Sequence, residues 1–280
     1  MCASLERLQL LQYSTEVSKA ADTSPDHWVW VGFALGAAVG LLLGILLFAP
    51  ARWVKPVVEQ WSDGHVLLVH GEGTVWQGSA QLVLSGGPGS RDSTRLPGQV
   101  SWGVTMQSGW VGLQLHAECC TESAIILHIM PDLRGWHAKM LPSVSIWPAS
   151  LLAGLGYPWN SIQLKGSLYL STDGFELSSI DRRLAFRGAL TLLAPSVHSR
   201  ISGTLPIGSY RLVLQGNGDT ALLLDTLEGA LQLSGGGHWE DSQLYMQVHA
   251  RPIADDRTDL GDLLRLMSQY KGKLSFVMPG

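Results

Sequence analysis

The sequence predicts a mainly β protein: a curved antiparallel sheet meander with one or two short covering helices, preceded by a single transmembrane helix. One long run without charged residues lies near the N-terminus. From about residue 64 onward, apolar residues alternate with others, which is the period of a β-strand. Charged residues make up only 15% of the chain and glycines number 32, a composition typical of strands joined by tight turns. The length of 280 residues accommodates one span and a domain of roughly 220 residues.

The N-terminal elements are predicted from charge and length. Residues 1–27 are polar and are expected to form a flexible tail. Residues 28–49 carry no charge, and a helix of this length measures about 33 Å, enough to cross a hydrocarbon layer of about 30 Å. We therefore expect a transmembrane helix at 28–49, which the prolines at 50 and 56 end, and a linker at 50–63.

An alternative for this run is a removable signal peptide. Ala49-Pro50-Ala51 has the small-x-small form of a signal-peptidase site. The apolar run is longer than a typical signal, and the tail lacks a basic n-region. A retained anchor is therefore the expected state.

Four glycines recur at every fourth position of the predicted span and would leave a shallow groove of bare backbone. In lipid, close backbone packing is one of the few forces that bring helices together. We predict that this face binds a partner helix, or a second copy of the chain. The face consists of Gly32, Gly36, Gly40 and Gly44.

The domain at 64–280 is predicted strand by strand. Strands are expected at 65–69, 73–76, 80–84, 99–106, 109–118 and 123–130, with a solvent-exposed loop at 85–98 that is rich in glycine, serine and proline. Further along, a glycine and a small residue precede leucines at every second position, as in residues 166–170, 188–192 and 229–233. This pattern predicts a meander whose strands place a row of leucines on one face, with glycine at bends or bulges.

Two short segments are predicted to cover that apolar face. Residues 148–155 begin with a proline suited to a first helical turn, and residues 258–270 place leucines and a methionine at helical spacing. Residues 272–277 have the pattern of an additional edge strand. Three tryptophans, Trp76, Trp102 and Trp110, fall near strand ends, where core filling is expected.

No pattern in the chain indicates catalysis, a cofactor or a metal. The sequence contains no H-E-x-x-H, paired C-x-x-C or G-x-S-x-G motif, and the net charge of −4 gives no reason to expect nucleic acid as a partner. His116, Glu118 and Cys120 would share a face if they lay on one strand, but an exposed strand face is the expected interpretation. Cys119 and Cys120 are adjacent, so they could be joined by a strained disulfide bond or remain as two free thiols. A further alternative is that both are ordinary small residues at a strand end.

The segment Gly73-Thr74-Val75-Trp76-Gln77-Gly78 resembles the signature of the type II secretion system protein N family, also called general secretion pathway protein N. A short tail and one uncleaved span before this segment, and leucine-rich segments after it, are similar to that family's order. The resemblance implies a single-pass protein of the bacterial inner membrane, with a cytosolic N-terminus and a periplasmic β-rich domain. Charge leaves the orientation open, because lysine and arginine are balanced across the span.

Two functions are compatible with these features. The resemblance implies an accessory component of the secretion apparatus, which links the inner-membrane platform to periplasmic components or the secretin by protein contacts and is not an enzyme. Its partners would be other inner-membrane secretion components. The alternative is a membrane-anchored periplasmic protein that handles lipid in an apolar groove, as in AsmA-like proteins. The two differ in whether the chain's own helices fill the groove.

Overall fold

The computed structural model describes residues 27–107, 109–157, 159–180, 183–200, 206–217, 220–240 and 243–252. It divides into two compact units, Met1–Ala49 and Pro50–Gly280. Residues 1–26 of the tail expected at 1–27, the helix expected at 258–270 and the strand expected at 272–277 lie outside the described residues.

The first unit contains the apolar helix α2 (His27–Leu47). Within the described residues, α2 is the one helix long and apolar enough to cross a membrane, and 0% of its window Trp30–Leu47 is buried in the protein. A helix that is apolar on every side requires an apolar partner or solvent around it. These properties are consistent with a single-pass membrane anchor.

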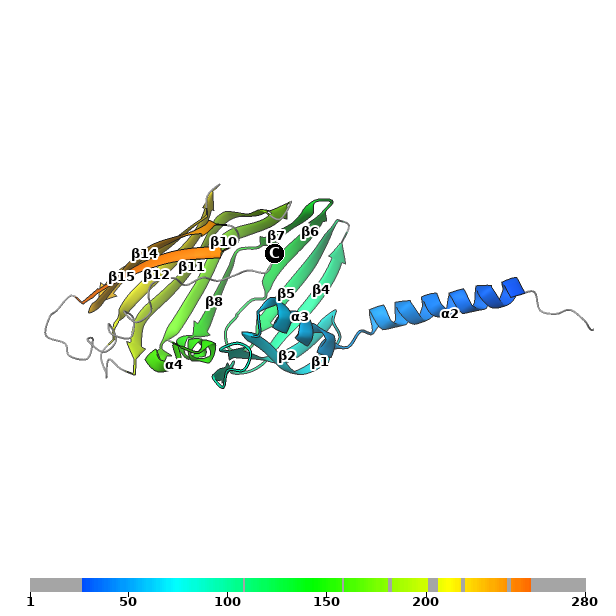
Figure 1. Cartoon of the computed structure of the whole chain (residues 1–280), viewed down its shortest axis with the longest axis horizontal. Coiled ribbons are helices and arrows are strands. Elements are labelled where there is room, and N and C mark those ends of the chain that lie inside the picture. The colour runs from blue at the N-terminus through cyan, green and yellow to red at the C-terminus, as the bar shows by residue number, and fades with distance from the viewer. Residues whose placement is uncertain are drawn as a thin grey trace, which may run out of the picture. The chain divides into compact units, whose positions relative to one another are not determined.

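In the second unit, the described residues form one antiparallel sheet of fifteen strands, with neighbours mostly consecutive in the chain (Figure 1). The main path runs β1-β2-β4-β5-β6-β7-β10-β11-β12-β13-β14-β15, while β3, β8 and β9 pair with β2, β10 and β11. Such an order is the predicted meander. The strands are β1 (Val66–Gly73), β2 (Gln77–Ser85), β3 (Ser93–Arg95), β4 (Val100–Gln107), β5 (Trp110–Ala117), β6 (Ile125–Asp132), β7 (Gly135–Met140), β8 (Ser143–Pro148), β9 (Leu164–Lys165), β10 (Ser167–Ile180), β11 (Arg183–Ser199), β12 (Gly208–Asn217), β13 (Thr220–Gly229), β14 (Leu231–Glu240) and β15 (Gln243–Pro252).

Strand β10 joins the two halves of the sheet. Its first half pairs with β8 and its second half with β7, and the register shifts between Thr172 and Phe175. Gly174 lies in this bulge with φ +136°, a conformation that glycine adopts readily. The Thr172 hydroxyl donates to Ala189 O (2.7 Å) and accepts from Gly174 N–H (3.1 Å), so it stabilises the bulge. The bend at β10 is therefore built into the sequence by a threonine and a glycine.

One face of the sheet is apolar, as the glycine–leucine pattern predicted. Leu170, Leu192, Leu212 and Leu224 lie side by side on four neighbouring strands. The opposite face carries ion pairs such as Lys139–Glu176, whose Nζ and Oε1 atoms are 2.9 Å apart. The hydrogen bond from Lys139 lowers the pKa of Glu176, so this carboxylate remains ionised.

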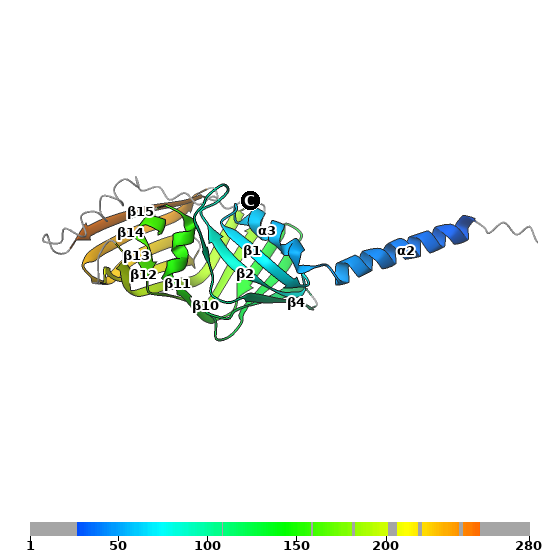
Figure 2. The same ribbon diagram turned by 90° about the horizontal axis from the view of Figure 1, so that it is seen from below.

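Short helices cover parts of the apolar face (Figure 2). They are η1 (Ala51–Trp53), α3 (Val54–Trp61), η2 (Ala149–Leu155) and α4 (Trp159–Ile162). Leu151 of η2 packs in a buried cluster with Leu96, Ala117 and Cys120. The predicted covering segment at 148–155 is thus confirmed, and it forms a 3₁₀ helix. Residues 51–61, expected as a linker, instead form η1 and α3.

Two further clusters show how η1 and α4 contribute. Ala51 packs with Ala80 and the buried Trp102, the role expected for this tryptophan. Ile162 packs with Ile207 and Leu231 beneath the C-terminal half of the sheet. Each covering helix thus seals one region of a long apolar face.

Several predicted boundaries were wrong for reasons of pairing. Residues 74–76, predicted as strand, form the turn between β1 and β2. The loop 85–98 contains β3, because its residues 93–95 pair with residues 83–85 of β2. Strand β5 ends at Ala117, where Thr121 Oγ1 accepts a hydrogen bond from the Ala117 N–H (2.9 Å) and starts a turn.

Leu231 lies at the centre of the C-terminal cluster. Its carbonyl oxygen accepts a hydrogen bond from the Tyr210 hydroxyl (3.1 Å), and its N–H donates to Ile207 O (3.2 Å). Burial raises the pKa of Tyr210 to about 12, so the hydroxyl remains protonated and able to donate over the physiological range. The side chain of Leu231 is held by the buried cluster, and its backbone is held by the hydrogen bonds to Tyr210 and Ile207.

We expect Leu231→Ala to lower the free energy of unfolding by about 2–4 kcal/mol, because a buried leucine leaves a cavity. Leu223→Ala is the matched control, since Leu223 is 45% exposed and Leu231 is 1% exposed. We expect this control to change stability by less than about 1 kcal/mol. Denaturant unfolding of the purified full chain in detergent measures both variants. Equal losses would contradict the assignment of Leu231 to the core.

Candidate interaction surfaces

The sheet is open, so it offers two strand edges. Within the described residues, β1 pairs only with β2, and β15 pairs only with β14. An edge strand presents backbone N–H and C=O groups that can pair with another chain. The two edges are therefore candidate interaction surfaces.

The β1 edge is partly blocked by the chain itself. His65 O accepts from Ser85 N–H (2.9 Å), and antiparallel alternation then turns the backbone groups of Val66 and Leu68 outward. The Ser62 hydroxyl accepts from Val66 N–H (3.0 Å) and donates to Val66 O (3.2 Å). Leu68 borders a cavity of about 240 Å³ that Arg52 and Lys55 also line. Ser62 thus covers this edge at Val66, and a cavity borders it at Leu68.

The β15 edge is longer and more regular. Its ten residues pair in continuous register with β14, from Gln243 opposite Glu240 to Pro252 opposite Leu231. The side chains of Gln247, His249 and Arg251 are exposed, and those between them are half-buried. A strand with this alternation has the geometry needed to receive another strand.

The motif at 73–78 forms the tight turn between β1 and β2. Thr74 N–H donates to Gln77 O (2.8 Å), and Thr74 Oγ1 accepts from Gln77 N–H (3.1 Å). Gly73 has φ +84°, and a Cβ there would lie 2.5 Å from Gln77 O, so only glycine fits. The motif's first residues therefore encode backbone shape.

The rest of the motif anchors this turn to the next strand. Val75 O accepts a hydrogen bond from Trp102 Nε1 (3.0 Å), and Trp76 O accepts from Val104 N–H (2.7 Å). A Cβ on Gly78 would lie 2.7 Å from the Trp102 ring. All five predicted motif residues, Gly73, Thr74, Val75, Trp76 and Gly78, thus contribute to one turn, closed over Trp102.

A shallow hollow lies beside the turn on the polar face of the sheet. It has a volume of about 450 Å³, and its lining includes Gly78, Ser101, Gly103, Gln114 and His116. Small residues at three of these strand positions leave the space open. The lining offers hydroxyl, amide and imidazole groups, which suit polar contacts with a protein surface.

The side chains of His116, Glu118 and Cys120, which have the types found in metal sites, make other interactions in the structure. His116 Nδ1 lies 2.9 Å from Thr121 Oγ1, and Glu118 Oε2 accepts from Gln99 N–H (3.1 Å). Cys119 and Cys120 form a disulfide bond. Because β5 ends at Ala117, His116, Glu118 and Cys120 do not share a strand face, and that premise was wrong. In the part of the chain that the structure describes, no group of three or more metal-binding side chains occurs.

Trp110 also differs from its expected role. Its ring centroid lies 4.0 Å from that of His128, and it covers Gly112 on the polar face. A Cβ on Gly112 would lie 2.7 Å from the Trp110 ring. Trp110 therefore packs outside the leucine face.

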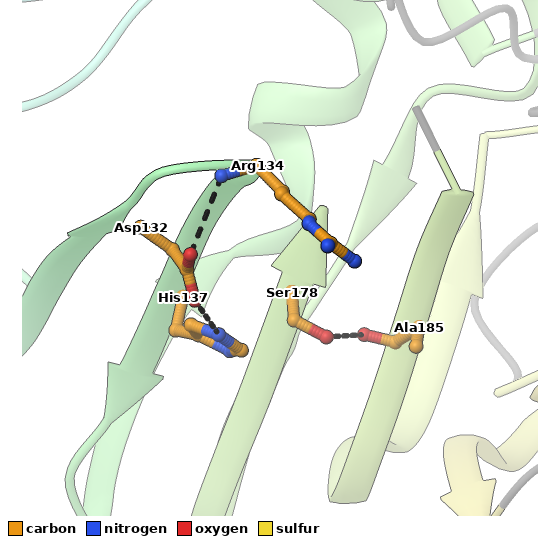
Figure 3. A network of polar contacts seen from close by, with 5 residues as sticks. All are labelled: Asp132, Arg134, His137, Ser178 and Ala185. Atoms are coloured by element: carbon orange, nitrogen blue, oxygen red, sulfur yellow. Dashed lines mark hydrogen bonds and ion pairs between the residues drawn. The ribbon is translucent and has the colours of Figure 1, made fainter. Parts of the chain in front are cut away.

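Polar contacts also fasten the strands near the β6–β7 turn (Figure 3). Asp132 Oδ1 accepts from Arg134 N–H (3.3 Å), and Asp132 Oδ2 lies 3.6 Å from His137 Nε2. The Ser178 hydroxyl donates to Ala185 O (3.5 Å) across the neighbouring strands β10 and β11. These exposed contacts hold turns and strand ends together.

The glycines of α2 are open in the structure. A Cβ added at Gly32, Gly36, Gly40 or Gly44 would meet nothing within 4 Å. In the first unit itself, nothing described fills the groove they form. The association face remains a prediction.

The motif turn allows a paired test of two glycines. Gly78→Ala brings a methyl group against Glu72 O and the Trp102 ring, at 2.6 and 2.7 Å, whereas a Cβ on Gly103 of the neighbouring strand meets nothing within 4 Å. We expect Gly78→Ala to lower the free energy of unfolding by about 1–3 kcal/mol. We expect Gly103→Ala to be neutral or stabilising by up to about 1 kcal/mol. Denaturant unfolding compares the two, and equal effects would contradict the packing described.

Comparisons with known proteins give the family. No curated protein and no solved structure matches this chain. The family model described as type II secretion system (T2SS), protein N, matches residues 65–276. That range covers most of the chain and includes the motif turn and the whole described sheet. The chain therefore belongs to the type II secretion system protein N family.

Proposed function

We propose that this protein is an accessory inner-membrane component of the type II secretion apparatus. In this proposal α2 spans the inner membrane, the N-terminus is cytosolic and the sheet domain is periplasmic. The domain links the inner-membrane platform to periplasmic components or the secretin by protein contacts. Family membership supports a role in type II secretion, and the apolar helix supports a single-pass anchor.

The observation that carries the linking role is the open sheet. In the described residues the meander ends in β1 and β15, and on such edges a partner strand can add main-chain hydrogen bonds. The β15 edge is the better candidate, because Ser62 occupies outward groups of β1. The exposed side chains of Gln247, His249 and Arg251 then determine which partner strand binds.

The anchor supplies a second contact within the membrane. Its glycines lie on one side of a helix that buries none of its apolar window in the protein. A partner helix on that side gains close backbone packing, which lipid chains do not provide. The same face would also allow two copies of this chain to associate.

Photo-crosslinking in intact secreting cells tests the edge contact. A photoreactive residue at His249 of β15 is expected to crosslink to another secretion component. The matched control is Gln232 of β14, which is exposed but lies on an interior strand. Position 91 in the loop before β3 is a third probe. Adducts at Gln232 but none at His249, with secretion intact, would overturn the edge assignment, and lipid adducts at His249 would do the same.

The glycine face is tested by Gly36→Leu with Gly40→Leu. We expect in-membrane helix association to fall about tenfold, equal to about 1.4 kcal/mol, because the larger side chains separate the backbones. The control is Ala34→Leu with Ala38→Leu, since a rotation of about 100° per residue places these alanines on nearly the opposite side. A two-hybrid assay for membrane helices measures both pairs. Equal association of the two double variants would contradict the assignment.

A further inference from the structure

The end of η1 and helix α3 together expose an apolar stripe. Trp53, Val57 and Trp61 follow one another at a spacing of four residues, and they are 49%, 54% and 72% exposed. Residues with this spacing lie on one helix face. Most of a large apolar surface is therefore open to the surroundings along the whole length of α3.

A neighbouring side of the same helix packs on the sheet, since Val54 and Val58 lie roughly 60–100° around the helix from Val57. Val54 lies against the buried cluster of Ala51, Ala80 and Trp102, and Val58 is half-buried. The orientation of α3 on the sheet is thus fixed by its own packing. The exposed stripe is not needed to hold the helix in place, and two exposed tryptophans, one ending η1 and one ending α3, call for another partner.

The chain itself restricts where α3 can lie. The apolar helix ends at Leu47 and η1 begins at Ala51. Four peptide steps reach at most about 14 Å, and the headgroup layer on each side of a bilayer is roughly 5–7 Å thick. If α2 spans the membrane, the first turn of α3 therefore lies within reach of the headgroup layer.

The residue types on the exposed side of α3 suit that layer. Tryptophan is enriched at membrane–water interfaces, where its ring is apolar and its N–H finds polar partners. The charged side chains of Arg52, Lys55 and Glu59 are exposed and lie roughly 140–160° around the helix from Val57. A helix with an apolar stripe on one side and charges on the other is typical of helices that lie in a membrane interface.

We infer that α3 lies in the plane of the membrane surface, with the Trp53, Val57 and Trp61 side chains in the boundary between headgroups and acyl chains. Because α3 packs on the sheet, this contact sets the height and tilt of the whole sheet domain above the bilayer. The inference rests on the proposed function, in that α2 must span the membrane.

Spin labels on the full chain in nanodiscs of anionic phospholipid test this contact. Single cysteines are placed at Val57, at Glu59 and at Leu42 of α2, with Cys2→Ser in the background. Saturation measurements give each label's accessibility to oxygen, which partitions into lipid, and to a nickel chelate, which stays in water. We expect the oxygen-to-nickel ratio at position 57 to exceed that at position 59 severalfold, and a high ratio at position 42.

The three labels separate the failure modes. A high ratio at position 42 with equal, water-like ratios at 57 and 59 would overturn the surface contact and leave the anchor intact. A water-like ratio at position 42 would overturn the anchor, and the surface contact with it.

Substitutions of the stripe supply a second measurement. Trp53→Gln with Trp61→Gln is expected to lower the oxygen-to-nickel ratio of the label at position 57 at least twofold. The control is Leu133→Gln, since Leu133 is fully exposed on the β6–β7 turn. A ratio unchanged by the double substitution would show that the tryptophans do not hold α3 on lipid.

Discussion

The alternation of side chains along every strand governs this structure. An antiparallel sheet with a leucine face on one side must remove that face from water, or the free energy of burial is lost. Here η1, η2 and α4 each seal a region by placing a small number of apolar side chains beneath the strands: Ala51, Leu151 and Ile162. The covering elements are short because each one needs to reach only its own cluster.

The same requirement explains the bulge in β10. Sheets of fifteen strands normally twist or curl. A flat sheet of this size would leave its leucine face open to solvent. The register shift between Thr172 and Phe175 lets one strand pair with β8 at one end and β7 at the other. Bending at this point brings η2 and α4 beneath the strands they cover. Among the described residues, β1 and β15 are the terminal strands of the bent sheet.

The proposals give the anchor, the surface helix and the sheet edge separate contacts. In these proposals the glycine face of α2 meets a helix within the membrane, the tryptophan stripe meets the membrane surface, and the β15 edge, at the other end of the sheet path from β1, meets a partner strand. Family membership places the protein in an apparatus whose parts work together. Each of its three surfaces would meet a different environment, so separate variants can disable them one at a time.

The motif at 73–78 illustrates how a local signature relates to function. Its glycines and threonine specify a tight turn, and its backbone carbonyls hold Trp102 and β4. The shape of the turn restricts which residues fit it, since a Cβ at Gly73 or Gly78 would clash with neighbouring atoms. The adjacent polar hollow is lined by these two motif glycines together with Ser101 and Gly103 of β4.

The sequence by itself determined the elements that depend on local pattern. The apolar run, the period-two strands, the leucine rows and the covering segment at 148–155 were all predicted, because hydrophobic periodicity and chain length act within a few residues. Tertiary structure alone decided which strands pair, that residues 93–95 join β2, that β5 stops at Ala117, and that Trp110 packs outside the leucine face. It also decided that residues 51–61 of the expected linker form η1 and α3, with Val54 packed on the sheet cluster and Trp53 and Trp61 left exposed. These features depend on partners far apart in the chain, and no local pattern records them.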